Sequence, residues 1–246
     1  MNRLGKLTWV ELKLFVREPI TIIFSFALPL MGVFVLSEVF GSNPDPDAFL
    51  GVAPTDYYVS SYIGLALLAF SLISLPVHLT GYKERGVLRR LRASSVPVWS
   101  LLGAHLIATF IFSVLCAALV FIVSFLAYDV SLPASPALLV VAFVLSTVCF
   151  AALGVLLGAV LPTARSAQGV GVLLFFIMFY LGGCGPPFDV MSSILQRIGD
   201  ATPFKHAVIL MQDLWLGFGW NNTEFFIVIG VTVVAVILSI RFFRWE

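Results

Sequence analysis

The histidines and lysines are the side chains of this sequence whose spacing would reveal a catalytic or nucleotide site. His78, His105 and His206 are widely separated and do not form the H-E-x-x-H pattern of a zinc protease, and no G-x-S-x-G nucleophile motif occurs. None of the four lysines is followed by Ser or Thr, as a phosphate-binding loop requires. We therefore expect a protein that is not an enzyme. A unit that hydrolyses nucleotides would have to be a separate chain.

The densest group of charged residues lies between residues 83 and 92. Its members are Lys83, Glu84, Arg85, Arg89, Arg90 and Arg92. Val87, Leu88 and Leu91 add one apolar edge, so we expect a short basic helix from Lys83 onward. A loop that only fixes orientation in a membrane would explain the arginines but not Glu84 or the apolar edge. A short helix packed on lipid headgroups would explain both.

The composition excludes a water-soluble globule and a disordered chain. Of 246 residues, 60% are hydrophobic, 11% are charged and 23 are Phe, whereas soluble domains carry about 25% charged residues. A membrane-spanning helix needs about 20 mostly apolar residues. Six stretches meet or approach this length, so we expect an all-α polytopic membrane protein with one transmembrane domain over residues 20–246. The expected spans are 20–39, 58–79, 98–128, 137–161, 167–182 and 225–243. Pro29 and Pro76 should kink the first two.

The lysines and arginines predict the orientation of these spans. Twelve of the fourteen fall before span one, between spans two and three, between spans four and five, or after span six. Only Arg197 and Lys205 fall on the other side. The positive-inside rule places the twelve, and both termini, in the cytoplasm of a bacterial-type cell membrane.

Two further segments are expected outside the spans. Residues 1–19 should contain an interfacial helix over residues 3–18, with Arg3, Lys6, Lys13 and Arg17 on one face. Leu4, Leu12 and Phe15 should occupy the opposite face. Residues 183–224 should form an outer segment with two re-entrant or interfacial helices, because its apolar runs are too short to span.

Small and aromatic residues mark places where spans should pack. Gly154 and Gly158 form a close-packing motif, which we expect to seat span four on a neighbour in the same chain. Phe175, Phe176, Phe179 and Tyr180 make span five aromatic, either for packing or as a wall that binds apolar solutes. Cys116 and Cys149 should be buried in the protein interior, and the role of the outer Cys184 stays open.

This layout resembles the membrane subunit of type-2 ABC exporters, a group that moves drugs, lipids and polysaccharides. The resemblance is most specific in the stretch Glu84-Arg-Gly-Val-Leu-Arg-Arg-Leu-Arg-Ala-Ser-Ser-Val-Pro97, which is similar to the family's E-[RK]-G-[TV]-L-x-x-[LI]-x-x-[ST]-P-[VL] region. It departs from that pattern at Ser95, where the family has Pro. A second similarity runs from Phe188 to Val208 and contains Thr202-Pro203-Phe204-Lys205-His206-Ala207.

The resemblance implies a transport complex rather than a single working chain. Two permeases, identical or different, would pair above two ATP-binding subunits, which would hold the ATP and Mg²⁺; the permease itself would bind no cofactor. Residues 81–97 would form the coupling loop that docks on the ATPase, and the helix over residues 3–18 would be a connecting helix that also contacts it. Contacts with the ATPase would come from Lys83, Glu84, Arg85, Arg89, Arg90, Arg92, Glu11 and Lys13. Solute contacts would come from Tyr62, Phe70, Phe175, Phe176, Phe179 and Tyr180.

The aromatic, uncharged interior favours export of hydrophobic or amphipathic solutes, such as antibiotics and other drugs, or lipids, over a polysaccharide or a lipid-linked glycan. Membrane lipid is an expected partner, and nucleic acid is not. A stand-alone ion-coupled or facilitative carrier is the main alternative. The absence of Asp, Glu, Lys and Arg from the middle of the expected spans argues against ion coupling. An enzyme acting on lipid and a scaffold protein are further alternatives.

Overall fold

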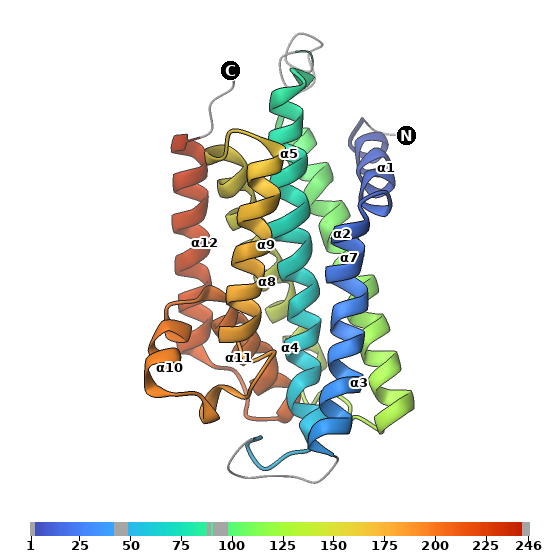
Figure 1. Ribbon diagram of the computed structural model, residues 1–246, viewed down its shortest axis with the longest axis vertical. Coiled ribbons are helices and arrows are strands. Elements are labelled where there is room, and N and C mark those ends of the chain that lie inside the picture. Colours follow the sequence, from blue (N-terminus) through green and yellow to red (C-terminus); the bar gives the residue numbers. More distant parts are fainter. Residues whose placement is uncertain (1–2, 42–48, 88–89, 91–97, 243–246) are drawn as a thin grey trace.

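The computed structural model describes residues 3–41, 49–87, 90 and 98–242, and the described residues form helices joined by turns, without a β-strand. Figure 1 shows the helices aligned along one long axis. The helical elements are α1 (Arg3–Val16), α2 (Pro19–Ile22), η1 (Ile23–Ala27), α3 (Leu28–Phe40), α4 (Pro54–Ala69), η2 (Phe70–Ser74), α5 (Leu75–Glu84), α7 (Val98–Tyr128), α8 (Pro136–Val160), α9 (Ala164–Leu181), η3 (Phe188–Val190), α10 (Ser193–Asp200), α11 (Pro203–Leu216) and α12 (Asn222–Phe242).

Six continuous helical runs among the described residues are long and apolar enough to cross a membrane, which confirms the expected fold class. They are Pro19–Phe40, Pro54–Glu84, Ser100–Tyr128, Pro136–Val160, Ala164–Leu181 and Asn222–Phe242. The second is longer than the expected 58–79, because Pro54 begins the helix one turn earlier and the helix continues to Glu84. The expected loop at 81–97 therefore begins inside a helix.

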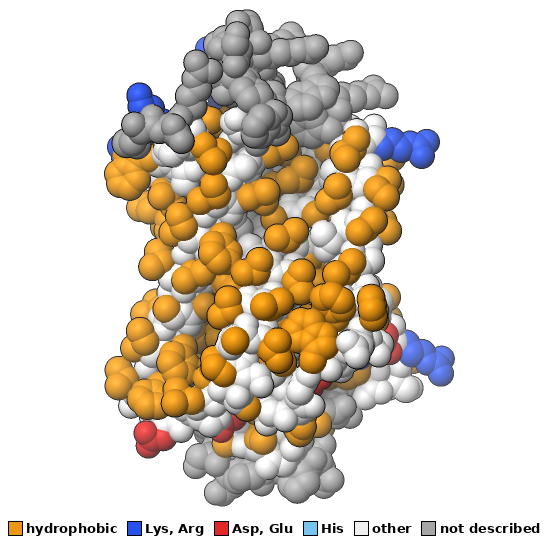
Figure 2. Space-filling model, turned by 180° about the vertical axis from the view of Figure 1, so that it is seen from behind, with side chains coloured by type: hydrophobic (Ala, Val, Ile, Leu, Met, Phe, Trp, Pro, Cys, Tyr) orange, Lys and Arg blue, Asp and Glu red, His pale blue; other side chains and the backbone are white. Residues whose placement is uncertain are grey.

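The two described ends of the chain, Arg3 and Phe242, lie at the same end of the bundle, as an even number of spans requires (Figure 1). We call this the α1 end and the opposite one, which carries α10 and α11, the α11 end. Figure 2 shows hydrophobic side chains over the length of one face, with charged side chains gathered toward the two ends. This distribution suits a protein whose middle is surrounded by lipid.

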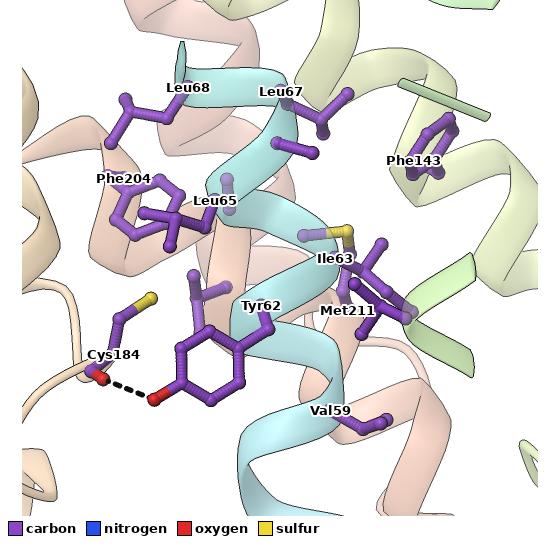
Figure 3. Close-up of a cluster of buried hydrophobic side chains, with 14 of the residues drawn as sticks. Val59, Tyr62, Ile63, Leu65, Leu67, Leu68, Phe143, Cys184, Phe204 and Met211 are labelled. Atoms are coloured by element: carbon purple, nitrogen blue, oxygen red, sulfur yellow. Dashed lines mark hydrogen bonds between the residues drawn. The ribbon is translucent and has the colours of Figure 1, made fainter. Parts of the chain in front are cut away.

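The second span, α4–η2–α5, is the central helix of the bundle. About 89% of its most apolar window is buried, whereas the corresponding figure for the other spans is 17–39%. It packs against α3, α7, α8, α9 and α11. In Figure 3, Tyr62, Leu65, Leu67 and Leu68 of this helix point toward different neighbours, among them Phe204, Phe143 and Cys184.

Spans one and two each contain one π-helical turn shortly before a proline, η1 before Pro29 and η2 before Pro76. Proline has no backbone N–H, and its ring crowds the carbonyl four residues earlier, so the regular helical pattern cannot continue through it. The freed carbonyls find other neighbours: the Cys116 thiol donates to Ser25 O at 2.7 Å. The expected kinks thus take the form of π turns.

Glycines let α8 and α9 approach the backbone of the central helix. A Cβ added at Gly154 would lie 2.0 Å from Ser71 O, and one added at Gly171 would lie 2.1 Å from Leu72 O. Gly158 approaches the Leu79 side chain in the same way. The prediction that Gly154 and Gly158 seat span four within the same chain is confirmed.

At the α11 end, α11 lies among the spans rather than on top of them. Its buried face packs on α4, α8 and α12, and Gln212 donates to Tyr57 O at 3.0 Å. The Tyr58 hydroxyl donates to Gly185 O at 2.8 Å, and the Tyr62 hydroxyl donates to Cys184 O at 3.0 Å (Figure 3). Cys184 is fully buried, so its thiol is not positioned at an exposed surface of this chain.

Candidate functional site

Helix α1 packs along the first turns of α7, and its buried face differs from the expected one. Thr8, Glu11 and Phe15 are buried, spaced three and four residues apart as one helix face requires, whereas Leu4, Trp9 and Val16 are exposed. The Phe15 ring lies 5.6 Å from that of Phe70 and 5.4 Å from that of Phe112. The face that holds α1 in place is therefore built around an acidic residue.

Glu11 lies in a buried polar cluster between α1, α5 and α7. Its carboxylate accepts a hydrogen bond from the Tyr82 hydroxyl on Oε1 at 2.6 Å, and its Oε2 lies 2.9 Å from His105 Nδ1. His78 Nδ1 is 3.6 Å from the same Oε2. Only 1% of Glu11 is exposed, so this carboxylate faces the interior of the chain.

Glu18, immediately before span one, completes the cluster. Its Oε2 accepts hydrogen bonds from the Ser74 hydroxyl at 2.8 Å and the Thr21 hydroxyl at 2.9 Å, and its Oε1 pairs with His78 Nε2. We define the polar cluster as Glu11, Glu18, His78, Tyr82 and His105.

The surroundings of both carboxylates favour their ionised form. Burial alone would raise the pKa of Glu11, but hydrogen bonds from His105 and Tyr82 and the charge of the imidazoles outweigh it, so the pKa lies below the usual value. The pKa of Glu18 is lowered in the same way, with burial opposed by His78, Ser74 and Thr21. The cluster and its immediate surroundings therefore supply hydrogen-bond donors to both carboxylates.

The residues expected to contact an ATPase divide into exposed and internal ones. Glu84, Arg85 and Lys13 are exposed, and Arg90 is exposed while donating to Arg85 O at 2.8 Å. Arg85 ends α5, and Gly86 follows with a φ of 63°, which turns the chain away from the helix axis. Arg89 and Arg92 lie outside the described residues.

Two of these residues, Lys83 and Glu11, bind other parts of the same chain. The Lys83 ammonium donates to the carbonyls of Gly158 at 2.5 Å and Ala159 at 2.8 Å, so it caps the last turn of α8. Glu11 is turned inward, as described above, and its carboxylate is not positioned at the surface of this chain. The sequence around Glu11 is basic and apolar, and it did not indicate that Tyr82 and His105 are its partners.

The residues expected to contact solute are also placed unequally. Phe176 and Tyr180 are about half exposed, whereas Phe70, Phe175 and Tyr62 are buried. Phe70 packs against Phe15 and Phe112 near α1, away from the remaining members of the set. Its ring is therefore positioned for packing, and its contact with solute stays a prediction.

Tyr62 and Phe179 line an apolar groove of about 340 Å³ between span one and the chain that follows α9. Met31, Val35 and Cys184 are among its other lining residues, and none of them was expected from the sequence. Gly32 allows the Tyr62 ring to lie against span one, because a Cβ there would be 2.4 Å from the ring. A glycine within an apolar span was the available sequence signal for this close contact.

The six apolar helical runs define a polytopic helical membrane protein. The family model described as ABC-2 type transporter matches residues 3–214, which is most of the chain. The chain belongs to this family. Over 241 residues it is 24% identical to the protein named "Putative transport permease YvfS" of Bacillus subtilis (strain 168), with 97% of this chain and 96% of that protein aligned.

Proposed function

We propose that the chain is the membrane subunit of an ATP-driven exporter of hydrophobic or amphipathic solutes, powered by separate ATP-binding subunits at the α1 end. The observation that carries the proposal is the exposed charged tip of the central helix. Glu84 and Arg85 lie at the end of α5, whose last turn projects beyond the neighbouring helices (Figure 1). Exposed charges of both signs are suited to charge-assisted contacts with another protein.

The neighbours of this tip connect it to the rest of the bundle. Tyr82 binds Glu11 of α1, and Lys83 binds the end of α8. A displacement of the tip by a partner would therefore move α1 and α8 with it. Membership of the ABC-2 family supports a partner of the ATP-binding kind.

The apolar groove supports a hydrophobic or amphipathic solute. Its wall consists almost entirely of carbon atoms, contributed by residues such as Met31, Val35 and Phe179. A strongly polar solute such as a glycan would find few hydrogen-bond partners there. Met31 and Val35 of its lining are exposed on span one, so the groove is accessible from that side of the bundle.

The first experiment tests the energy source. The permease is purified with the ATP-binding subunit that accompanies it and is reconstituted in vesicles. We expect solute export that requires ATP, whereas export by the permease alone would contradict the proposal. Glu84→Lys should leave membrane insertion intact and break the link between ATP hydrolysis and export. Two matched variants each remove one exposed carboxylate: Glu84→Gln at the α1 end and Asp129→Asn at the opposite end of the bundle. Only Glu84→Gln should lower export.

The second experiment tests the groove. Phe179→Ala should change the order in which a panel of apolar drugs and fluorescent lipids stimulates ATP hydrolysis. Phe226→Ala removes an equally large ring that is exposed on α12, so the order should stay unchanged. An identical effect of both variants, or a general loss of folded protein in Phe179→Ala alone, would favour a packing role for Phe179.

A further inference from the structure

The polar cluster at the α1 end has the composition and spacing of a metal site. Glu11, His78 and His105 each offer one ligand atom, and these three atoms lie within 4.8 Å of one another. Two of the separations are 2.9 Å, from Glu11 Oε2 to His105 Nδ1, and 3.6 Å, from Glu11 Oε2 to His78 Nδ1. A tetrahedral zinc ion with ligand bonds of about 2.0–2.1 Å separates its ligands by about 3.3 Å.

The groups around two of these ligands, His78 and Glu11, are arranged as supports for a metal ion. The far nitrogen of His78, Nε2, pairs with Glu18, and Glu18 is itself held by Ser74 and Thr21. Such a carboxylate–histidine pair orients the ring and raises the basicity of the nitrogen that faces the metal. The Tyr82 hydroxyl binds Glu11 Oε1, which leaves Oε2 directed toward both imidazoles.

An unsatisfied nitrogen points to a missing partner in this cluster. His78 Nδ1 is buried and has no hydrogen-bond partner, and the nearest carboxylate oxygen is 3.6 Å away, which is too far for a hydrogen bond. When His78 Nε2 carries the proton that it shares with Glu18, Nδ1 presents a lone pair toward Glu11. Two electron-rich atoms facing each other in a buried site repel one another unless a cation lies between them.

We propose that Glu11, His78 and His105 bind one divalent transition-metal ion of the zinc type, with Glu18 and Tyr82 orienting the ligands. Each ligand comes from a different helix, so the ion fixes α1 against α5 and α7 at the base of spans two and three. Three protein ligands leave one position of a tetrahedron for water. The proposal is independent of the transported solute and of the energy source.

The test uses the tag-free full-length permease in detergent, from which a chelator has removed any metal. The protein is then titrated with Co²⁺, because four-coordinate Co²⁺ absorbs visible light strongly. We expect each chain to bind one equivalent of Co²⁺, and we expect Zn²⁺ to displace it. Glu11→Gln, which keeps an acceptor for Tyr82, and His78→Gln should each abolish the signal. Glu18→Gln should weaken binding about ten- to a hundredfold. His206→Gln is the matched control, because His206 forms a single His–carboxylate pair with Glu224, and it should leave the signal unchanged.

Thermal unfolding provides a second readout. Zn²⁺ should raise the unfolding midpoint of the wild type and of His206→Gln but not that of Glu11→Gln, since an ion that binds the folded state stabilises it. The proposal is overturned if the stripped wild type takes up no stoichiometric Co²⁺. It is equally overturned if Glu11→Gln elutes as folded protein and binds Co²⁺ as the wild type does. Either result would assign the cluster to hydrogen bonds that hold the three helices together without a metal ion.

Discussion

Gly171 should tolerate no side chain, although it lies in an apolar span where alanine is normally favourable. A Cβ at this position would lie 2.1 Å from the backbone oxygen of Leu72, the carbonyl four residues before Pro76. Carbon–oxygen contacts are normally about 3.3 Å or longer, so Gly171→Ala must push α9 about 1.2 Å away from the central helix. The neighbouring atom belongs to the backbone and cannot rotate aside.

Gly169→Ala is the matched control, because Gly169 lies in the same helix and a Cβ there would meet nothing within 4 Å. Overpacking costs about 1–3 kcal/mol, whereas replacing Gly by Ala in an open helix position gains about 0.8–1 kcal/mol. The two variants should therefore differ by about 2–4 kcal/mol in the free energy of unfolding. For a chain of this size, that difference corresponds to roughly 4–16 °C in the unfolding midpoint.

The assay follows from the cysteines. Cys116, Cys149 and Cys184 are all buried, so a thiol-reactive fluorescent dye reports unfolding directly. Gly171→Ala should melt below the wild type and Gly169→Ala at or above it. Equal midpoints for the two variants would refute the reasoning, because they would mean that α9 does not approach the Leu72 carbonyl closely.

Three further predictions concern single side chains, and each is measured by the same dye assay. Burial and the nearby Glu224 raise the pKa of Asp213 in the fold, although the hydrogen bond from Asn221 opposes them. The ionised form of Asp213 therefore destabilises the protein once the pH has risen through that pKa. Asp213→Asn should raise the unfolding midpoint near pH 7, and this gain should vanish as the pH falls toward about 4. Thr163→Ala removes the capping box with Ser166 at the start of α9 and should cost about 0.5–2 kcal/mol, whereas an unchanged midpoint would show that the cap is dispensable. Phe15→Ala should cost about 3–5 kcal/mol, because the ring is fully buried between α1, the central helix and α7; a loss below 1 kcal/mol would mean that α1 is not held by this face.

The spans could be predicted from the sequence because a lipid bilayer imposes a minimum length on an apolar helix. The prolines predicted where spans one and two depart from regular α-helix. They did not predict that the departure is a π turn, because this form depends on which groups donate hydrogen bonds to the freed carbonyls. Ser25 O is satisfied by Cys116, which is 91 residues away in the chain. Contacts of this kind are set by the tertiary arrangement.

The candidate site was harder to predict, for two physical reasons. Lipid is as apolar as a protein interior, so hydrophobicity cannot separate Phe175, which is buried, from Phe176, which faces outward on the same helix. The polar cluster depends on partners that are distant in sequence: Glu11 meets Tyr82 and His105 across 71 and 94 residues. The spacing of His78 and Tyr82, four residues apart on one helix face, was the local signal that could have been used.

The end of the central helix is fixed on two sides by consecutive residues. Tyr82 reaches α1 through Glu11, and Lys83 reaches α8 through the carbonyls of Gly158 and Ala159. Successive side chains on a helix point about 100° apart, so neighbouring residues can bind two different helices. The next two residues, Glu84 and Arg85, are exposed and free to meet a partner. A force applied to Glu84 would therefore be shared at once by three helices, whether or not the polar cluster holds a metal ion.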